Sequence, residues 1–339
     1  MSASAQTAPP SIDLFFETVH AFHRTAVLKA ALELNLFTAI DEGAATVNAL
    51  AAKCASSTRG IRILCDYLTV MGWLTKSGDS YQLSGEAATF ASRKSPAYVG
   101  GAIEFLLSPT QMEAFAHLTE AVRKGGTAAT KEGVVAPDHP VWVGFAKAMM
   151  PLMAFPAELF AELLSTGPPA KKILDIAAGH GIFGIAVARR SPEAEVTALD
   201  WENVLTVAQE SAHSAGVANR YSKLVGSAFD VPYGSDYDLI LLTNFLHHFD
   251  LETCEQLLKK VYAALKAGGR AAILDFVPNE DRISPAVPAQ FSLMMLATTP
   301  SGDAYTYPQY QTILRKAGFS RTELHPLHPT FFSAIVAHK

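Results

Sequence analysis

The sequence predicts an α/β protein with two domains: a mainly helical amino-terminal domain, then a three-layer domain around a mainly parallel sheet. Residues 171–200 carry the clearest pattern, because they read as strand, glycine loop, helix and strand. Strand and helix patterns then alternate to residue 337, which is typical of a sheet covered by helices on both faces. Thr-Gly-Pro-Pro at 166–169 breaks the preceding helix and predicts domains at 11–165 and 166–339.

The composition limits the possible classes of protein. A chain of 339 residues is long enough for two domains, and its 49% hydrophobic content predicts large cores and an additional buried oligomer surface. A net charge of −5 offers no broad basic field for nucleic acid. Cys54, Cys65 and Cys254 lack metal-ligand spacing, so we expect reduced thiols, no metal site and a cytoplasmic protein.

No segment of the sequence predicts export or membrane insertion. The first ten residues lack the basic and apolar segments of a signal peptide and read as a loose tail. No uncharged apolar run reaches the ~18 residues that a membrane span needs. We therefore expect a soluble protein with no membrane partner.

The first domain begins with one or two helices over residues 11–36, where apolar side chains recur at helical spacing. Two further helices are expected at 46–53 and 59–71, and two short strands joined by a turn at 72–75 and 81–83. Two helices followed by a two-stranded wing make a winged-helix module.

The winged-helix module has two interpretations, DNA binding and subunit packing. Its second helix offers Arg59 and Arg62 to phosphates, but most of the following positions are apolar. Because phosphate partners are so few, the pattern favours a packing and dimerisation unit, and no nucleic-acid partner is expected.

The remaining elements follow in order along the chain. Helical stretches at 96–124 and 139–164, separated by a Gly- and Ala-rich loop at 125–137, complete the first domain. A long connection at 279–306 is of the kind that usually carries function. In the second domain we expect strands at 173–176, 195–199, 221–225, 237–242, 270–277, 321–325 and 331–337, and helices at 183–190, 204–215, 252–265 and 308–317.

The glycine loop indicates a nucleotide-like ligand at the carboxyl ends of the strands. Gly179, Gly181 and Gly184 spell G-x-G-x-x-G, the pattern of dinucleotide-binding oxidoreductases. Asp175, at the end of the first strand, would instead repel a pyrophosphate and suits a cationic ligand without phosphate, such as S-adenosylmethionine. Asp200 would accept hydrogen bonds from ribose hydroxyls in either case, so both interpretations stay open.

With these motifs, residues 11–338 resemble class I S-adenosylmethionine-dependent methyltransferases. More narrowly, they are similar to small-molecule O-methyltransferases that carry a winged-helix dimerisation domain, such as the caffeate-type, acetylserotonin and bacterial natural-product enzymes. The segment 175–181, Asp-Ile-Ala-Ala-Gly-His-Gly, matches the D-x-G-x-G-x-G loop, with Ala177 replacing the first glycine. The resemblance implies a Rossmann-like, seven-stranded methyltransferase domain, a homodimer through the first domain, and S-adenosylmethionine as cofactor, with S-adenosylhomocysteine as product.

The resemblance also implies a set of cofactor-binding residues. Asp200 matches the ribose-binding acid, Ser227 replaces an acid that usually contacts adenine, and Thr243 replaces a common lysine. The complete implied set is Asp175, Ala177, Gly179, Gly181, Asp200, Trp201, Ser227, Ala228, Phe229, Thr243 and Asn244.

The family's catalytic base falls on His247, and a carboxylate that orients it falls on Asp275. A neutral imidazole, with an ordinary pKa of about 6.5, takes a phenol or enol proton at cellular pH and so makes the oxygen a better nucleophile. The family's second acid falls on Ala304, with Asp303 beside it. In the alternative interpretation, the histidine only shapes the pocket of a C- or N-methyltransferase. His248 is expected to be structural.

Apolar segments similar to the family's acceptor pocket complete the predicted site. A slot lined by Met and Phe suits a flat aromatic or polyketide-like acceptor. The residues concerned are Phe145, Met149, Met153, Phe291, Met294 and Met295. Three functional classes therefore stay in view: a methyltransferase, a nicotinamide-dependent oxidoreductase, and a ligand-sensing winged-helix regulator.

Overall fold

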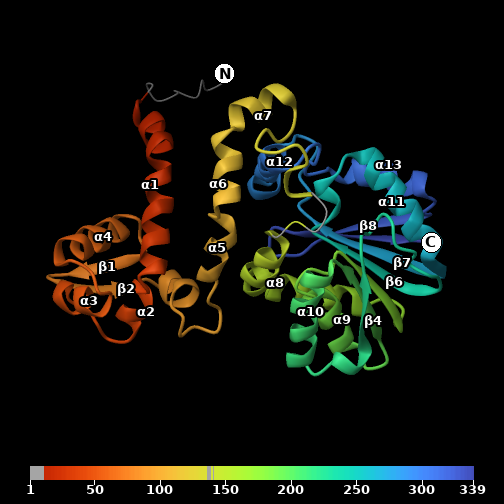
Figure 1. Ribbon diagram of the computed structural model, residues 1–339, viewed down its shortest axis with the longest axis horizontal. Helices are drawn as coiled ribbons and strands as arrows, with labels where there is room; N and C mark the ends of the chain where they lie inside the picture. The colour runs from red at the N-terminus through yellow and green to blue at the C-terminus, as the bar shows by residue number, and fades with distance from the viewer. Residues whose placement is uncertain (1–10, 136–138, 140) are drawn as a thin grey trace, which may run out of the picture. The chain divides into compact units, whose positions relative to one another are not determined.

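The computed structural model describes residues 11–135, 139 and 141–339 (Figure 1). Contacts divide the chain into two compact units, with the boundary between Ile103 and Glu104. The predicted loose tail at 1–10 and the end of the predicted loop at 125–137 lie outside the described residues.

The first unit is built from helices and one hairpin. Two of its helices begin where a side chain caps them: the hydroxyls of Thr46 and Ser57 accept hydrogen bonds from Ala49 N and Gly60 N. The order of helix, helix and hairpin is that of the predicted winged-helix module (Figure 1). The elements are α1 (Asp13–Glu33), α2 (Leu36–Asp41), α3 (Val47–Lys53), α4 (Thr58–Val70), β1 (Leu74–Ser77), β2 (Ser80–Leu83), a π-helical turn (Ala87–Ala91) and a 3₁₀ turn (Gly100–Ala102).

The second unit contains a seven-stranded sheet in the order β5-β4-β3-β6-β7-β9-β8. The first five strands of that order are parallel, and β9 is antiparallel to both of its neighbours. The strands are β3 (Lys172–Ile176), β4 (Glu195–Asp200), β5 (Tyr221–Val225), β6 (Tyr237–Thr243), β7 (Leu265–Asp275), β8 (Arg321–Pro326) and β9 (Ser333–His338). The predicted α/β architecture is confirmed.

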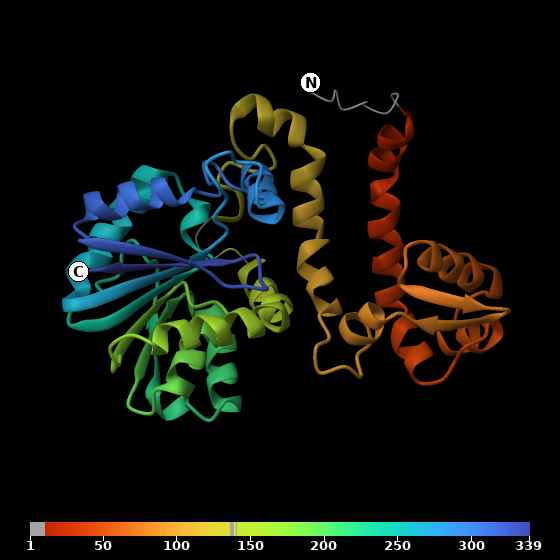
Figure 2. The ribbon, with the colours of Figure 1, turned by 180° about the vertical axis from the view of Figure 1, so that it is seen from behind.

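Helices cover both faces of this sheet, as both views show (Figures 1 and 2). Successive strand residues point to opposite faces: Ile173 packs with α8, α9 and α10, whereas Leu174 packs with α11 and α13. The helices are α5 (Ile103–Leu106), α6 (Pro109–Ala116), α7 (Leu118–Lys124), α8 (Val141–Ser165), α9 (Ile182–Arg190), α10 (Glu202–Ser214), α11 (Leu251–Ala264), α12 (Ala286–Thr298) and α13 (Tyr307–Ala317). Short 3₁₀ turns occur at Gly133–Val135, Ala218–Arg220 and Leu246–His248.

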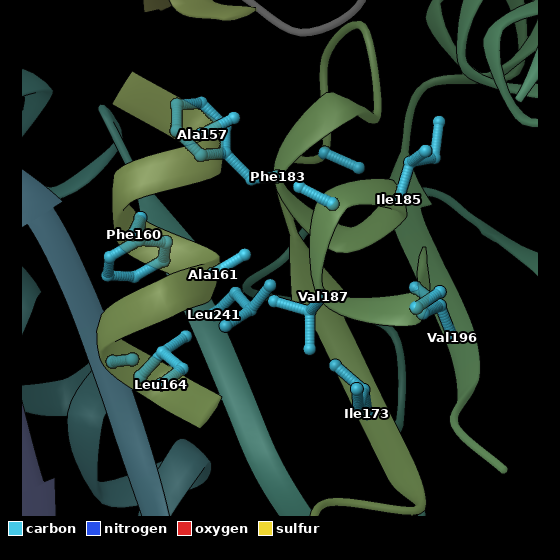
Figure 3. Close-up of a cluster of buried hydrophobic side chains, with 14 of the residues drawn as sticks. Ala157, Phe160, Ala161, Leu164, Ile173, Phe183, Ile185, Val187, Val196 and Leu241 are labelled. Atoms are coloured by element: carbon cyan, nitrogen blue, oxygen red, sulfur yellow. The ribbon is translucent and has the colours of Figure 1, made fainter. Parts of the chain in front are cut away.

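The contact boundary differs from the predicted boundary at 165/166. Phe160, Ala161 and Leu164 of α8 are buried against α9 and the sheet of the second unit (Figure 3). The Thr-Gly-Pro-Pro break ends α8 but does not separate it from the sheet, because the apolar face of the helix is buried there.

Helix α8 also differs from the expectation of no membrane-length segment. By length and composition alone this helix could cross a membrane: it is 25 residues long, and an 18-residue window within it has a mean hydropathy of 1.3 and few charged residues. In the structure 39% of that window is buried, and its buried residues belong to the core (Figure 3). Core packing therefore accounts for the buried part of this helix.

Two further elements depart from the sequence prediction. The connection at 279–306 contains helix α12, which is apolar on most of its circumference and so lacks the amphipathic pattern that reveals a helix. Strand β7 begins at Leu265, ahead of its predicted start, because it continues through Gly268 and Gly269. A Cβ on Gly269 would lie 2.8 Å from the Tyr237 carbonyl oxygen, so only glycine permits this close pairing.

The loop that follows α7 is docked on the end of α12. Thr127 N donates a 2.8 Å hydrogen bond to Thr299 O. A Cβ on Gly126 would lie 2.1 Å from the carbonyl oxygen of Pro300, and one on Gly133 would lie 2.2 Å from that of Thr298. The Gly-rich sequence of this loop therefore permits two backbone segments to touch.

Gly126→Ala should lower the free energy of unfolding by ~1–3 kcal/mol. The added Cβ would clash with a backbone carbonyl, which cannot move aside as the end of a flexible side chain can. The matched control is Gly144→Ala in α8, where an added Cβ meets no atom within 4 Å. This control should be neutral or should stabilise the protein by ~0.5–1 kcal/mol through helix propensity. Denaturant melts measure both changes, and equal stability of the two variants would contradict the docking argument.

Candidate active site

A cavity of about 380 Å³ lies in the second unit, at the carboxyl ends of β3, β4, β5 and β6. This is the edge at which an open parallel sheet binds its ligands. It is lined by Val135, Trp142, Phe145, Ala177, Ala178, Gly179, His180, Phe183, Leu199, Asp200, Trp201, Val204, Gly226, Ser227, Ala228, Phe229, Asp230, Thr243, Asn244, Phe245, His248 and Phe249.

Most of the predicted cofactor-binding residues meet at this cavity. The structure places Ala177, Gly179, Asp200, Trp201, Ser227, Ala228, Phe229, Thr243 and Asn244 on its wall. Asp175 and Gly181 do not line the cavity: Asp175 accepts a hydrogen bond from Gly184 N, and Gly181 packs against Tyr221 and Ala208. The sequence analysis missed His180, Phe183, Phe245 and Phe249, each of which is next to or near a predicted position.

The glycine loop depends on left-handed backbone. Ala177, Gly179 and Gly181 have φ angles of 53°, 58° and 76°. Ala177 therefore keeps the conformation of the glycine that it replaces, at some cost in strain. A Cβ on Gly181 would lie 2.5 Å from the hydroxyl oxygen of Tyr221, so this glycine lets the loop pack over that buried side chain.

Two carboxylates lie beneath and beside the loop: Asp175 is buried, and Asp200 is partly buried. Asp200 accepts hydrogen bonds from Gly179 N (2.9 Å) and Trp201 N (2.8 Å), and burial raises its pKa to about 6. Asp175 accepts one from Gly184 N (3.2 Å), and burial, with the charge of Asp200, raises its pKa to about 7. Asp175 Oδ1 is buried with no hydrogen-bond partner among the described residues.

This donor set fits a cationic ligand. No lysine or arginine is among the described residues that line the cavity, so a pyrophosphate would lack counter-charges there. Among the described residues, the hydrogen-bond donors to Asp175 and Asp200 are backbone N–H groups and not cations, and burial raises the pKa of both carboxyls. An ammonium or sulfonium group supplies that missing charge.

Beside the cavity, a buried hydrogen-bonded group is centred on Asp275. Its Oδ1 accepts from His247 Nδ1 at 2.6 Å and from Phe276 N at 2.8 Å, and its Oδ2 accepts from the Tyr310 hydroxyl at 2.8 Å. Because the carboxylate accepts at Nδ1, that nitrogen carries the proton and the lone pair of His247 is on Nε2. The carboxylate thereby fixes the orientation of the imidazole.

Tyr310 is a site residue that the sequence analysis missed. It lies in the first turn of α13, after the capping box formed by Thr306 and Gln309. A tyrosine in an amphipathic helix reads as a packing residue, and the sequence carries no signal that its hydroxyl meets Asp275.

The predicted second acid does not support the histidine ring. The Asp303 carboxylate pairs with Arg282 at 2.9 Å, and only its backbone N–H reaches the histidine turn, where it donates to His247 O at 3.0 Å. Ala304 is buried and brings no polar side chain.

The structure does not open the predicted acceptor pocket beside His247. His247 is buried behind the cavity wall, and Phe291 lies edge-to-face on its ring with centroids 4.8 Å apart. Of the six predicted acceptor residues, Phe145 lines the cavity, whereas Met149, Met153, Phe291, Met294 and Met295 do not. The Sδ atom of Met153 lies 3.8 Å from Asn244 Nδ2, next to the wall.

Two other histidines line the cavity without charge. Burial lowers the pKa of His180 to about 4, and burial with the neighbouring His247 lowers the pKa of His248 well below its usual range. His248 lies edge-on to Trp142 at 5.2 Å. Contrary to expectation, it is therefore a wall residue of the cavity as well as a structural one. Among the residues that the structure describes, no group of three or more His, Cys, Asp or Glu side chains is arranged to hold a metal ion.

Comparisons with known proteins decide which chemistry this geometry serves. An O-methyltransferase domain family matches residues 160–320, and an O-methyltransferase dimerisation domain matches residues 16–93. A solved structure of a candidate O-methyltransferase from Nostoc punctiforme is 54% identical, covers 98% of this chain and 100% of that chain, and superposes with a TM-score of 0.96. The chain belongs to the O-methyltransferase family.

More distant relatives agree with this assignment. A 3-hydroxy-5-methyl-1-naphthoate 3-O-methyltransferase from Streptomyces sahachiroi is 28% identical over 88% of this chain and 86% of its own length. Acetylserotonin O-methyltransferase from Mus musculus is 27% identical over 91% and 84%. Human N-acetylserotonin methyltransferase in complex with S-adenosylmethionine shares the fold, with a TM-score of 0.84, 22% identity and 99% coverage of both chains.

The chain is thus an S-adenosylmethionine-dependent O-methyltransferase. The dinucleotide interpretation of Gly179, Gly181 and Gly184 is wrong, as is the reading of the chain as a ligand-sensing regulator. In this chain two of the three glycines meet packing requirements, since Gly181 lies on Tyr221 and Gly184 lies on Asp175, so the pattern does not by itself indicate a pyrophosphate.

Binding of S-adenosylmethionine by this O-methyltransferase should tighten by about tenfold from pH ~5.5 to ~8. Asp175 and Asp200 have raised pKa values of about 7 and 6, whereas both ionise near pH ~3.9 in the unfolded chain. The ligand-free fold therefore holds extra protons between those values, and these groups destabilise it as the pH rises. A cationic ligand favours the ionised carboxylates, so binding expels the protons.

Calorimetry at the two pH values, with S-adenosylmethionine and S-adenosylhomocysteine, measures this effect. The product lacks the sulfonium charge and should show a shallower pH dependence. Asp200→Asn should flatten the dependence further, because it removes one of the two titrating groups. Equal affinities at both pH values would show that the two carboxylates do not sense the ligand.

Proposed function

We propose that this O-methyltransferase transfers a methyl group from S-adenosylmethionine to a hydroxyl of a small, apolar, aromatic metabolite, with His247 as general base. The observation that carries the proposal is the buried 2.6 Å contact between His247 Nδ1 and Asp275 Oδ1. A buried histidine held by a carboxylate in one tautomer is poised to accept a proton at its other nitrogen. S-adenosylmethionine, when bound, supplies an electrophilic methyl group on a sulfonium sulfur.

The proposed residues divide into a cofactor set and an acceptor set. Asp200 and Trp201 hold the ribose side, Asp175 compensates positive charge, and Ser227 and Thr243 provide hydroxyls on the cavity wall. Ala177, Gly179, Gly181, Ala228, Phe229 and Asn244 shape the surface around them.

The residues of this chain act on the acceptor proton. Nε2 of His247 takes the hydroxyl proton as the oxygen forms its bond to the methyl carbon, and the bond from that carbon to sulfur breaks. Asp275 stabilises the imidazolium that results, and the proton then passes to solvent. Holding the acceptor oxygen in line with the methyl group contributes most of the remaining rate.

The acceptor class follows from aromatic side chains and the lack of cations. Trp142 and Phe145 line the cavity, and their rings meet edge-to-face at 5.6 Å. Phe291 covers His247, so the acceptor takes the place of that ring beside Nε2 when α12 side chains shift. Met149, Met153, Met294 and Met295 are flexible apolar neighbours that can repack around a flat acceptor.

His247→Ala should lower turnover on a phenol by ~10²–10⁴, the range for a lost general base, and leave S-adenosylmethionine affinity nearly unchanged. Asp275→Asn should lower turnover by a comparable factor, because among the described residues Asp275 is the side chain that holds Nδ1 and so fixes the tautomer. The wild-type rate should rise with pH and then level off. An acceptor that is already ionised, such as a nitrophenol, should largely rescue His247→Ala.

Steady-state assays on the two acceptors decide between roles. Equal losses on phenol and nitrophenolate would mean that His247 positions the acceptor and takes no proton. Wild-type turnover of a high-pKa phenol by the variant would favour the alternative, a C- or N-methyltransferase without a base.

We also propose a cytoplasmic homodimer formed through the first unit. The matching dimerisation domain at 16–93 supports it, as do the exposed apolar residues of α1, among them Leu14, Phe15 and Phe22. Nucleic-acid binding by the winged-helix module is disfavoured, because Asp66 neutralises Arg62 (2.9 Å) and Lys76 (2.6 Å). The free, buried thiols of Cys54, Cys65 and Cys254 suit a reducing compartment.

Light scattering at micromolar concentration should give the mass of a dimer. Phe22→Glu should shift it to the monomer mass, because a charge in an apolar contact is costly. Val70→Glu is the matched control and should leave the mass unchanged: Val70 is 85% exposed and belongs to α4, not to the apolar surface of α1. A monomeric wild type, or retardation of random duplex DNA at physiological salt, would overturn this part of the proposal.

A further inference from the structure

Tyr310 is connected to the proposed base, His247, through the carboxylate of Asp275. Its hydroxyl, wholly buried, donates a 2.8 Å hydrogen bond to Asp275 Oδ2, and the other oxygen of that carboxylate contacts His247 Nδ1 at 2.6 Å. Phe276 N completes the donors around Asp275. Every hydrogen-bond donor stabilises the ionised form of a buried carboxylate. The Tyr310 hydroxyl therefore stabilises part of the negative charge of Asp275 that would otherwise interact with the imidazole.

The segment that carries Tyr310 also fixes the backbone of the histidine turn. Asp303 N donates to His247 O at 3.0 Å, and the Tyr305 hydroxyl donates to Phe249 O at 2.5 Å. A Cβ on Gly302 would lie 2.3 Å from His247 O, so this glycine is needed for the close approach. Residues 302–310 therefore hold both the turn and its carboxylate.

This segment supplies a phenol where a second carboxylate is absent. Ala304 has no polar side chain, and the Asp303 carboxylate is taken by Arg282. Among the described residues, the side chains that hydrogen-bond to Asp275 are those of His247 and Tyr310. Tyr310 is therefore the side chain that donates to the Asp275 oxygen that does not contact the histidine. The other titratable groups that face the pair are His248, whose ring centroid lies 4.3 Å from that of His247, Cys254 and Tyr305.

We propose that Tyr310 is a positioning residue for methyl transfer: its hydroxyl keeps Asp275 ionised and oriented, and lowers the proton affinity of the His247–Asp275 pair. The proposal rests on His247 as the general base. A donor on the carboxylate withdraws negative charge from the imidazolium, so the pair releases its proton more readily. His247 is then free to act as a base over a wider pH range.

Tyr310→Phe removes this donor without changing the shape of the core. The pair should then bind a proton more tightly, and the midpoint of the pH–rate profile on a phenol should rise by ~0.5–1 pH unit. Turnover should fall by about 3–10-fold below the midpoint and stay within about twofold of wild type on the plateau. Turnover of a nitrophenolate should change little at any pH.

The matched control is Tyr237→Phe. The Tyr237 hydroxyl is also buried and donates to a backbone carbonyl, Tyr233 O, at 2.9 Å. Both variants lose one buried hydrogen bond and should lose similar stability in thermal melts. Only Tyr310→Phe should move the pH–rate midpoint.

Ring NMR of His247 in the protein without substrate tests the inference apart from turnover. The midpoint pH of its signal should rise in Tyr310→Phe and not in Tyr237→Phe. An unmoved midpoint in a folded variant would overturn the proposal for Tyr310, even if His247→Ala behaves as expected of a lost base. If His247→Ala shows no base role but the ring midpoint still moves, the proposed function fails and the Tyr310 coupling stands.

A double-mutant cycle covers the case in which Tyr310→Phe is too unstable to titrate. In an Asp275→Asn background, adding Tyr310→Phe should leave phenol turnover within about twofold, because its route to the histidine is already broken. A further loss as large as in the wild-type background would mean that Tyr310 acts by general packing.

Discussion

Burial of carboxylates at the carboxyl ends of parallel strands is the constraint on which this site depends. Asp175 ends the core of β3, Asp200 ends β4 and Asp275 ends β7. A buried carboxylate is tolerated only with donors or a counter-charge. Asp275 has three donors from the chain, whereas Asp175 retains an unpartnered oxygen. This difference distinguishes Asp275, which orients a buried histidine, from Asp175, whose unpartnered oxygen can interact with a cationic ligand.

Close backbone approach is the second physical requirement, and it links the site to the fold. Gly181 lets the loop lie on Tyr221, and Gly184 lets α9 lie on Asp175, whose Oδ2 would be 2.7 Å from an added Cβ. Gly302 plays the same part between the α12–α13 connection and the histidine turn. In each case glycine is required because a neighbouring atom occupies the space that a side chain would take. These close contacts fix the positions of the acidic residues and the histidine relative to one another.

The strength of the sequence signal explains which parts of the fold were predictable. Strands such as Ile173–Ile176 are short apolar runs bounded by turns, and they align with β3 and its neighbours nearly residue for residue. Helix α12 was missed because its sequence is apolar on nearly all sides. Helix α8 was placed in the first domain because its own residues show that it has an apolar face, but not which surface that face packs against. Local pattern reveals an element, but not what the element packs against.

The same division holds within the site. The sequence by itself determined the βαβ unit, the glycine loop at Ala177–Gly181 and the acids at the strand ends, because these depend on local residue types and on the period of the strands. Only the tertiary structure decided that Tyr310 bonds Asp275, that Arg282 takes Asp303, and that Phe291 covers His247. Those contacts join residues distant in the chain, and their partners are chosen by how α12 and α13 pack, which no local pattern encodes.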